Sequence, residues 1–259
     1  GPITAGEYKV VGNISSQFIS GLIFALTLAD GDSVISITQP IESRSYINLT
    51  ISALKEFGVD VIWRDDRTLH IKGNQKYLAH EATVEGDYSN AAFLDALNVL
   101  GGSVDVLGLK EDSIQGDKVY RSLYRMLCKG TPTIHIGDCP DLGPVLFALA
   151  AVRNGAVFSG TRRLKIKESD RSGAMAEELK KFGTSVTVYD DSVVVYPADF
   201  HAPASPLCGH NDHRIVMSCA VLSTVTGGII EGAEASRKSL PDFFERLEKL
   251  GFEVIRHDA

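Results

Sequence analysis

The hydrophobic and polar positions of this chain follow a pattern that recurs four times. Each repeat opens on a short polar stretch, continues into an almost wholly apolar segment of helical length, and then reaches a short β-branched run. An amphipathic helical segment and further short strands follow. Because a helix without a polar face is buried on all sides, the first helix of each repeat should lie inside its domain and the second outside. The pattern therefore predicts repeated β/α units that stack in layers.

The boundaries of these elements follow from the periodicity and from the glycines that end it. The apolar helices are predicted over residues 18–28, 91–100, 143–153 and 215–224. The amphipathic helices are predicted over residues 46–57, 118–127, 171–182 and 241–250. The strands are predicted over residues 33–38, 59–64, 68–72, 133–136, 156–159, 185–189, 192–196 and 252–256. Since residues 73–85 show no periodicity, we predict a division into domains 1–83 and 84–259.

Composition narrows the range of partners. The 259 residues are 44% hydrophobic, which is enough for one large or two medium cores. The net charge of −7 argues against a nucleic-acid partner, although local cations can still bind a small anion. No apolar run reaches membrane-spanning length. The four cysteines lack the C-x-x-C spacing of a zinc site, so we expect no metal, a reducing compartment and a cytoplasmic location.

Two polar clusters stand at predicted helix starts, Lys167-Glu168-Ser169-Asp170-Arg171 and Asn211-Asp212-His213-Arg214. Carboxylates at such positions commonly cap the helix and complement its dipole. The alternative is a site that binds anions and moves protons, because exposed N–H groups, cations and acids then lie together. The presence of two such clusters favours the second interpretation.

Seven stretches of the sequence occur in the order in which one enzyme family carries them. They are GNISSQFISG at 12–21, ESRSYI at 42–47, VEGD at 84–87, PDL at 140–142, KIKESDR at 165–171, NDHR at 211–214 and RKSLPDFF at 237–244. Together they resemble the EPSP synthase family, which joins the enolpyruvyl group of phosphoenolpyruvate to the 5-hydroxyl of shikimate 3-phosphate and releases phosphate. The resemblance implies a transferase of the shikimate pathway, leading to chorismate and aromatic amino acids, that needs no cofactor. It also implies an inside-out α/β fold of repeated βαβαββ units, with one lobe partial and the other nearly complete.

The resemblance also implies roles for particular residues. Shikimate 3-phosphate would be bound by Ser15, Ser16, Gln17, Ser43, Tyr46, Asp141 and Lys167. Phosphoenolpyruvate would be bound by Arg171, Arg214 and Lys238. Asp141 and Glu168 would transfer protons during the reaction, and His213 is expected to be structural. From residue chemistry alone, helix capping is an alternative for Ser15 and Asp141, and Lys238 could be an ordinary surface lysine.

The sequence departs from the family in one respect. It lacks the Gly-Ser-Lys-Ser and Gly-Asn-Ala-Gly-Thr segments of the family's amino-terminal part, which supply substrate contacts. We therefore expect a carboxyl-terminal portion that is inactive alone and for which the missing segment is a partner. Two alternatives stay open. One is a domain that only binds ligand, and the other is a related enolpyruvyl transferase acting on a UDP-sugar.

Overall fold

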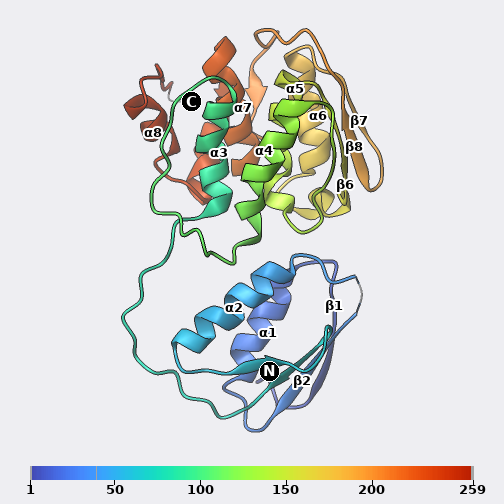
Figure 1. Ribbon diagram of the computed structural model, residues 1–259, viewed down its shortest axis with the longest axis vertical. Coiled ribbons are helices and arrows are strands. Elements are labelled where there is room, and N and C mark those ends of the chain that lie inside the picture. The colour runs from blue at the N-terminus through green and yellow to red at the C-terminus, as the bar shows by residue number, and fades with distance from the viewer. Residues whose placement is uncertain (1, 39, 258–259) are drawn as a thin grey trace. The chain divides into compact units, whose positions relative to one another are not determined.

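The computed structural model describes residues 2–38 and 40–257. The chain forms two compact units, drawn in Figure 1. The first comprises Gly1–Glu85 with Glu111–Gly116, and the second comprises Gly86–Lys110 with Asp117–Ala259. The stretch 73–85, predicted to lack periodicity, contains no helix or strand. The division into functional domains 1–83 and 84–259 stays a prediction.

The first unit has the element order βαβαββ. Its elements are β1 (Glu7–Val11), α1 (Ser16–Leu26), β2 (Ser33–Thr38), α2 (Arg44–Glu56), β3 (Val61–Trp63) and β4 (Thr68–Ile71). The strand order in the sheet is β1-β2-β4-β3. β1 runs parallel to β2, and β4 is antiparallel to both of its neighbours. A parallel pair needs a crossover connection, which α1 supplies.

One face of this sheet carries the core of the first unit. Alternate residues of β2, among them Ile35 and Ile37, are buried, as expected for a strand with one covered face. They form a single apolar cluster with Ile19 and Ile23 of α1. The prediction that α1 is buried on all sides is wrong, because its Phe18 is 66% exposed. A two-layer unit has one sheet face to cover, so α1 buries one stripe of side chains only.

The second unit contains the same repeat. Its elements are β5 (Thr133–His135), α5 (Gly143–Val152), β6 (Ala156–Ser159), α6 (Arg171–Lys181), β7 (Val186–Val188) and β8 (Ser192–Val195). The strand order β5-β6-β8-β7 matches that of the first sheet, with β5 parallel to β6 and β8 antiparallel to both neighbours. The predicted βαβαββ repeat is therefore confirmed.

Further elements flank this repeat in the second unit. They are α3 (Tyr88–Val99), α4 (Tyr120–Lys129), β9 (Leu207–Cys208), α7 (His213–Thr226), β10 (Ile230–Glu231) and α8 (Phe243–Lys249). The 3₁₀ helices are η1 (Gly116–Val119), η2 (Pro140–Leu142), η3 (Arg162–Ile166) and η4 (Ala233–Lys238). The apolar helices α3, α5 and α7 pack against one another (Figure 1). Every residue of Gly143–Ala151 is buried, as the sequence predicts for α5.

One predicted strand is absent and three observed strands were not predicted. Residues 252–256 form no strand. Instead Arg256 makes ion pairs with Glu248 at 2.9 Å and Glu245 at 3.2 Å, which hold the segment along α8. The unpredicted strands are β1, β9 and β10, of which the last two have only two residues each. Two residues are too few to show an alternating pattern.

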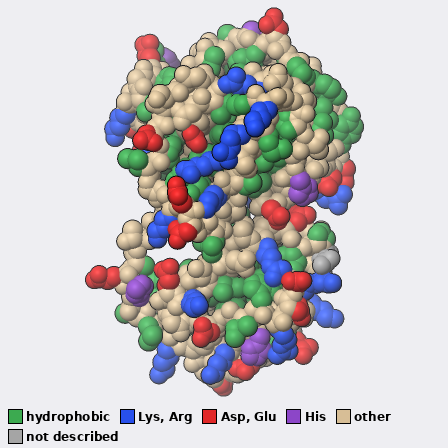
Figure 2. Space-filling view, in the orientation of Figure 1, with side chains coloured by type: hydrophobic (Ala, Val, Ile, Leu, Met, Phe, Trp, Pro, Cys, Tyr) green, Lys and Arg blue, Asp and Glu red, His purple; other side chains and the backbone are tan. Residues whose placement is uncertain are grey.

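The face shown in Figure 2 is neither uniformly charged nor uniformly hydrophobic. Hydrophobic side chains lie there in small groups among charged side chains of both signs. Among the described residues, no helix has both the length and the apolar content that a membrane span requires.

Candidate active site

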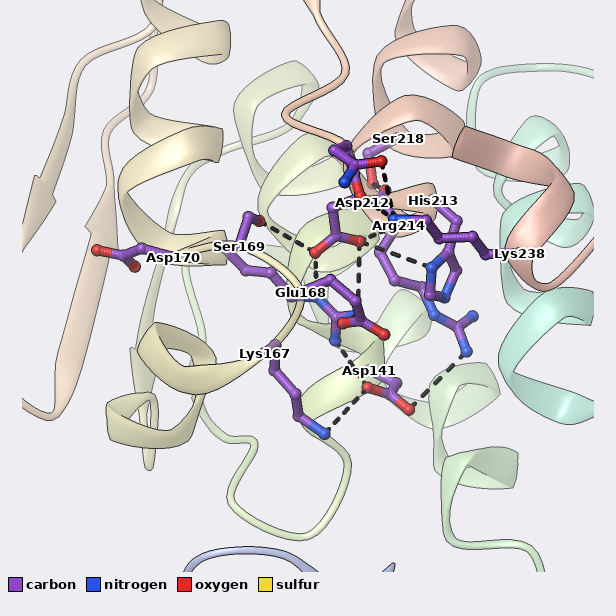
Figure 3. Close-up of polar contacts among 12 residues, drawn as sticks. Asp141, Lys167, Glu168, Ser169, Asp170, Asp212, His213, Arg214, Ser218 and Lys238 are labelled. Atoms are coloured by element: carbon purple, nitrogen blue, oxygen red, sulfur yellow. Dashed lines mark hydrogen bonds and ion pairs between the residues drawn. The ribbon is translucent and has the colours of Figure 1, made fainter. Parts of the chain in front are cut away.

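Arg171, the first residue of α6, links three carboxylates in the second unit. Its side chain is only 1% exposed. Its Nε donates to Asp212 Oδ2 at 2.9 Å, its Nη1 to Asp141 Oδ1 at 2.7 Å, and its Nη2 to Glu168 Oε2 at 2.6 Å (Figure 3). Hydrogen bonds between a guanidinium and carboxylates are among the strongest in proteins. The two polar clusters of the sequence therefore meet at one buried guanidinium.

Asp212 is the carboxylate that fixes this arrangement. It is fully buried and accepts from the backbone N–H of Arg214 at 2.9 Å, which caps α7. Its Oδ2 also accepts from the hydroxyl of Ser169 at 3.0 Å. Asp212 is not among the residues that the sequence predicts to bind substrate or transfer protons. Its position directly before an apolar helix, inside the Asn-Asp-His-Arg stretch, was the available signal.

Asp141 lies in η2, immediately before α5, and is surrounded by cations. Besides its bond to Arg171, its carboxylate lies 3.5 Å from Lys167 Nζ and 3.8 Å from Arg214 Nη2. Its side chain makes no capping hydrogen bond to α5 and is 23% exposed. The capping alternative therefore does not describe Asp141. We call Asp141, Lys167, Glu168, Arg171, Asp212 and Arg214 the Arg171 cluster.

Charge and burial oppose each other in the Arg171 cluster. Burial alone would raise the pKa of the Asp141 carboxyl, but Arg214, Lys167 and Arg171 outweigh it and hold that pKa well below its usual value. The pKa of Asp212 is likewise lowered, because Arg171 outweighs its burial. Both carboxyls are consequently ionised at neutral pH.

His213 behaves differently from the carboxylates. Burial, followed by the nearby Arg214 charge, lowers the pKa of His213. Its Nδ1 is buried without a hydrogen-bond partner and lies 3.9 Å from Asp212 Oδ1. A histidine with a lowered pKa is neutral at neutral pH, which fits the structural role expected for it.

Arg214 of the Arg171 cluster, and Lys238 beside the cluster, each have further partners. Arg214 donates from Nη1 to Asn90 Oδ1 of α3 at 3.3 Å, and its guanidinium lies 5.5 Å from the centre of the Phe93 ring. Lys238, in η4, is exposed and donates to both the carbonyl oxygen and the side-chain Oδ1 of Asn211. The amino-terminal ends of α3, α5, α6 and α7 thus converge on one set of side chains.

Helix capping does explain one residue of the Lys-Glu-Ser-Asp-Arg run. Asp170 accepts from the N–H of Gly173 at 3.2 Å at the start of α6. In Figure 3 its side chain points away from the Arg171 cluster. The capping interpretation of this run is therefore confirmed for Asp170, while the anion-binding interpretation of its other residues stays a prediction.

The first unit brings its own predicted residues together at the starts of α1 and α2. Ser15 caps α1 by accepting from the N–H of Gln17 at 3.3 Å, and Ser16 is buried beside it. The capping alternative for Ser15 is thus confirmed, while a phosphate-binding role for these residues stays a prediction. The N–H of Glu42 donates to Gly12 O at 3.1 Å and joins the loops before the two helices.

Ser43 and Tyr46 stand at the start of α2. Ser43 is buried and has a left-handed backbone with φ of 56°, which non-glycine residues seldom adopt. Its carbonyl oxygen accepts from the N–H of Tyr46 at 3.1 Å. Residues in strained conformations are concentrated at functional sites, so the observation directs attention to this helix start.

Comparison with known proteins gives the family. The sequence model of EPSP synthase (3-phosphoshikimate 1-carboxyvinyltransferase) matches residues 2–247. The chain belongs to the EPSP synthase family. It is 38% identical to the 3-phosphoshikimate 1-carboxyvinyltransferase of Clostridium kluyveri and 40% identical to that of Clostridium botulinum. These matches cover 98% and 97% of the chain, but only 64% and 63% of the respective relatives.

Solved structures of the family share the fold. The EPSP synthase of Acinetobacter baumannii superposes with a TM-score of 0.74 at 23% sequence identity. The match covers 96% of this chain and 63% of that protein. The α/β fold class predicted from the sequence is therefore confirmed.

Proposed function

We propose that this chain contributes to the transfer of the enolpyruvyl group of phosphoenolpyruvate to the 5-hydroxyl of shikimate 3-phosphate, with release of phosphate. The observation that carries the proposal is the Asp141 carboxylate, which is partly exposed and lies among Lys167, Arg171 and Arg214. Family membership supports the same reaction. A cytoplasmic location is part of the proposal and is supported by four cysteines that form no disulfide.

The cations of the site suit a substrate that carries both a phosphate and a carboxylate. Lys167 and Arg214 offer donors around the exposed edge of Asp141, and Lys238 offers an ammonium held by Asn211 just before α7. The Arg171 guanidinium is already bonded to three carboxylates. A direct contact of Arg171 with phosphoenolpyruvate therefore requires it to exchange Glu168, whose side chain is 41% exposed, for the substrate. If Arg171 keeps its bond to Glu168, its role is to hold Asp141 and Glu168 in position.

The proposed reaction is an addition followed by an elimination. The 5-hydroxyl oxygen bonds to C2 of phosphoenolpyruvate while its proton passes to the Asp141 carboxylate. Glu168, which enters the step protonated once the substrate has replaced it at Arg171, gives its proton to C3. In the tetrahedral intermediate the bond from C2 to the phosphate oxygen breaks, and the electron pair leaves with phosphate. The new methyl group returns its proton to Glu168, and phosphate takes the proton held by Asp141. Atoms and charges balance, and both acids return to their starting states.

The lowered pKa of Asp141 bears on its role as a base. A carboxylate among three cations is a weak base. An anionic substrate that binds the same cations weakens their effect on Asp141 and raises its pKa. The substrate would therefore prepare Asp141 to accept the hydroxyl proton. Within the first unit, Ser15, Ser16, Gln17, Ser43 and Tyr46 are proposed to bind shikimate 3-phosphate, which family membership supports.

Two measurements test the function. The first is phosphoenolpyruvate and shikimate 3-phosphate binding to the 259-residue chain by calorimetry at several salt concentrations. We expect weak binding that falls steeply with salt, because the contacts are charge-assisted. The second is phosphate release by the chain alone and by the chain joined to the amino-terminal segment of the Clostridium kluyveri relative. We expect release only from the joined protein.

Variants of the joined protein separate catalysis from binding. Asp141→Ala and Glu168→Ala should lower kcat more than they raise KM, since both residues move protons. Arg214→Ala should chiefly raise the KM for phosphoenolpyruvate. Release of phosphate with a UDP-sugar in place of shikimate 3-phosphate, or unchanged kcat in the Glu168→Ala variant, would contradict the proposal. A joined protein that binds both substrates without releasing phosphate would favour the binding-domain alternative.

A further inference from the structure

A second buried polar group lies on α6, outside the Arg171 cluster. Glu178 is fully buried, two helical turns beyond Arg171. Its Oε2 accepts from the N–H of Cys208 at 2.9 Å, and its Oε1 lies 2.9 Å from His210 Nε2. Lys181 donates to both carboxylate oxygens, at 3.1 and 2.8 Å, and to Pro206 O at 3.0 Å. Glu178 and Lys181 together therefore bind the segment 206–210.

Glu178, together with Glu177 and His210, also has the composition of a cation site. Ligand atoms of Glu177, Glu178 and His210 lie within 4.8 Å of one another. The Lys181 ammonium, however, already contacts both oxygens of Glu178. A buried carboxylate that is fully paired with protein donors is better explained by what it holds in place.

The segment that Glu178 binds ends in a tight turn with an unfavourable backbone. The N–H of Asp212 donates to Gly209 O at 2.9 Å, and the two residues between them both have positive φ, 48° at His210 and 51° at Asn211. These features are those of a type I′ turn, which favours Asn and Gly at its centre. A histidine at the first central position needs support from the surrounding structure.

Gly209 fixes the approach of this turn to its neighbours. A Cβ at position 209 would lie 2.7 Å from Val216 Cγ2 and 2.9 Å from Gly232 O. The N–H of Gly209 also donates to Glu231 O at 2.8 Å. The turn is therefore packed closely against α7 and β10, and its remaining freedom is at His210 and Asn211.

The turn presents the two groups on which the candidate site depends. Asn211 accepts from Lys238 Nζ through both its carbonyl oxygen and its Oδ1. Asp212 follows directly and accepts from Arg171 Nε at 2.9 Å. Helix α6 thus contacts the segment 206–212 at two places. Arg171, the first residue of α6, bonds to Asp212, and Glu178 and Lys181, farther along the helix, bond to residues 206–210.

We propose that Glu178 is a positioning residue of the candidate site. It holds the His210–Asn211 turn in its left-handed conformation, so that Asn211 orients the Lys238 ammonium and Asp212 meets Arg171. The consequence for phosphoenolpyruvate rests on the proposed function, whereas the effect on the turn does not.

The turn itself is measured by amide hydrogen exchange of the 259-residue chain. Protection of the Asp212 amide, which closes the turn, should fall at least tenfold in Glu178→Ala. Protection of Val157, in the sheet of the same unit, should stay within about twofold. Glu177→Gln is the matched control, because it also removes one negative charge from α6, at the neighbouring exposed position. Among the described contacts, Glu177 makes no hydrogen bond to segment 206–212. Unchanged Asp212 protection in Glu178→Ala overturns the proposal.

A second variant separates the turn from general stability. Glycine adopts positive φ without strain. Adding His210→Gly to Glu178→Ala should therefore restore much of the Asp212 protection. A merely structural role of Glu178 predicts no such rescue, so the absence of rescue also overturns the proposal. If Glu178→Ala fails to fold, Glu178→Gln, which keeps an acceptor for Cys208 but loses the charge paired with Lys181, takes its place in both measurements.

The effect on Lys238 is measured without substrate and then with it. An ammonium held by two oxygen acceptors reacts slowly with acylating reagents. Trace acetylation of Lys238 by acetic anhydride should therefore rise in Glu178→Ala and not in Glu177→Gln. Peptide mass spectrometry measures the extent of acetylation. In calorimetry, Glu178→Ala should weaken phosphoenolpyruvate binding about tenfold. If the unaltered chain binds no phosphoenolpyruvate, the proposed function fails while the exchange and acetylation results still decide the role of Glu178. Normal Lys238 acetylation in Glu178→Ala overturns it.

Discussion

Asp212→Asn is the substitution that tests the Arg171 cluster most directly. The change keeps the size of the side chain and an oxygen that can accept from the Arg214 N–H at the start of α7. It removes the charge that Arg171 meets at 2.9 Å inside the protein, where Arg171 is 1% exposed and Asp212 is not exposed at all. The effect therefore isolates the buried charge pair from the helix cap.

The magnitude follows from what remains around Arg171. Removing one partner of a buried ion pair typically costs about 3–5 kcal/mol, because an uncompensated charge is left behind. Here Arg171 keeps Asp141 at 2.7 Å and Glu168 at 2.6 Å, so it is not left unpaired. We therefore expect a loss near the lower limit, about 3 kcal/mol, in the free energy of unfolding.

Urea denaturation at pH 7, followed by circular dichroism, measures this loss. Asp170→Asn is the matched control, since Asp170 is an exposed cap of α6 and asparagine caps helices as well as aspartate does. It should change the unfolding free energy by less than about 0.5 kcal/mol. Equal effects of the two substitutions would refute the argument that the buried Asp212 charge holds the site together.

The same carboxylate makes a prediction about pH. Because the folded-state pKa of Asp212 is lowered, its charge contributes stability above the unfolded value of about 3.9 and loses that contribution as pH falls through the lower folded value. The difference in stability between the unaltered chain and Asp212→Asn should therefore be constant from pH 7 to about pH 5 and narrow below about pH 4. A difference that narrows already between pH 7 and pH 6 would contradict the assignment.

Three further predictions concern other parts of the chain. Gly12→Ala would place a Cβ 2.5 Å from Thr38 O and 2.7 Å from Pro40 O, so it should destabilise the first unit by about 2 kcal/mol. Urea unfolding followed by the fluorescence of Trp63, the only tryptophan of the sequence, measures this loss. Lys238→Gln should weaken phosphoenolpyruvate binding about tenfold in calorimetry while changing stability by less than about 0.5 kcal/mol, because Lys238 is exposed. Phosphoenolpyruvate binding should also take up protons near pH 4, because the cations that hold the pKa of Asp141 well below its usual value become shared with the ligand. Calorimetry in buffers of different ionisation enthalpy measures this uptake, and its absence would show that the anion binds elsewhere.

Periodicity was sufficient to predict the repeated elements. The apolar run 143–153 has no polar face, and α5 is buried over Gly143–Ala151. The alternating run 33–38 coincides with β2. Both patterns arise from burial against neighbouring layers, which is a local property of the sequence. The same reasoning failed for α1, because an apolar helix in a two-layer unit keeps one face exposed.

The charge pairing inside the site could not be predicted in the same way. Asp212 and Arg171 are 41 residues apart and are brought together by the tertiary packing of α6 against α7 and the segment before it. Glu178 lies on the apolar stripe of α6, four residues after Ala174 and three after Met175, and it is fully buried. The periodicity therefore indicates a buried position, but it does not show which donors pair with the carboxylate there. Contacts of this kind depend on which helices become neighbours, and periodicity carries no information about that choice.

The repeat itself explains why the charged side chains of the Arg171 cluster gather at one place in the second unit. The buried helices α3, α5 and α7 begin near one another, and their first residues or the residues just before them include Asn90, Asp141 and Asp212. Each helix start has unpaired N–H groups and a partial positive charge. The carboxylates Asp141 and Asp212 are therefore stabilised there, and they in turn hold Arg171 and Arg214 in fixed positions before any ligand arrives. Replacing a whole buried ion pair by apolar side chains often costs little stability, although removing one partner costs much more. We therefore propose that these pairs hold the cations ready to bind an anionic substrate.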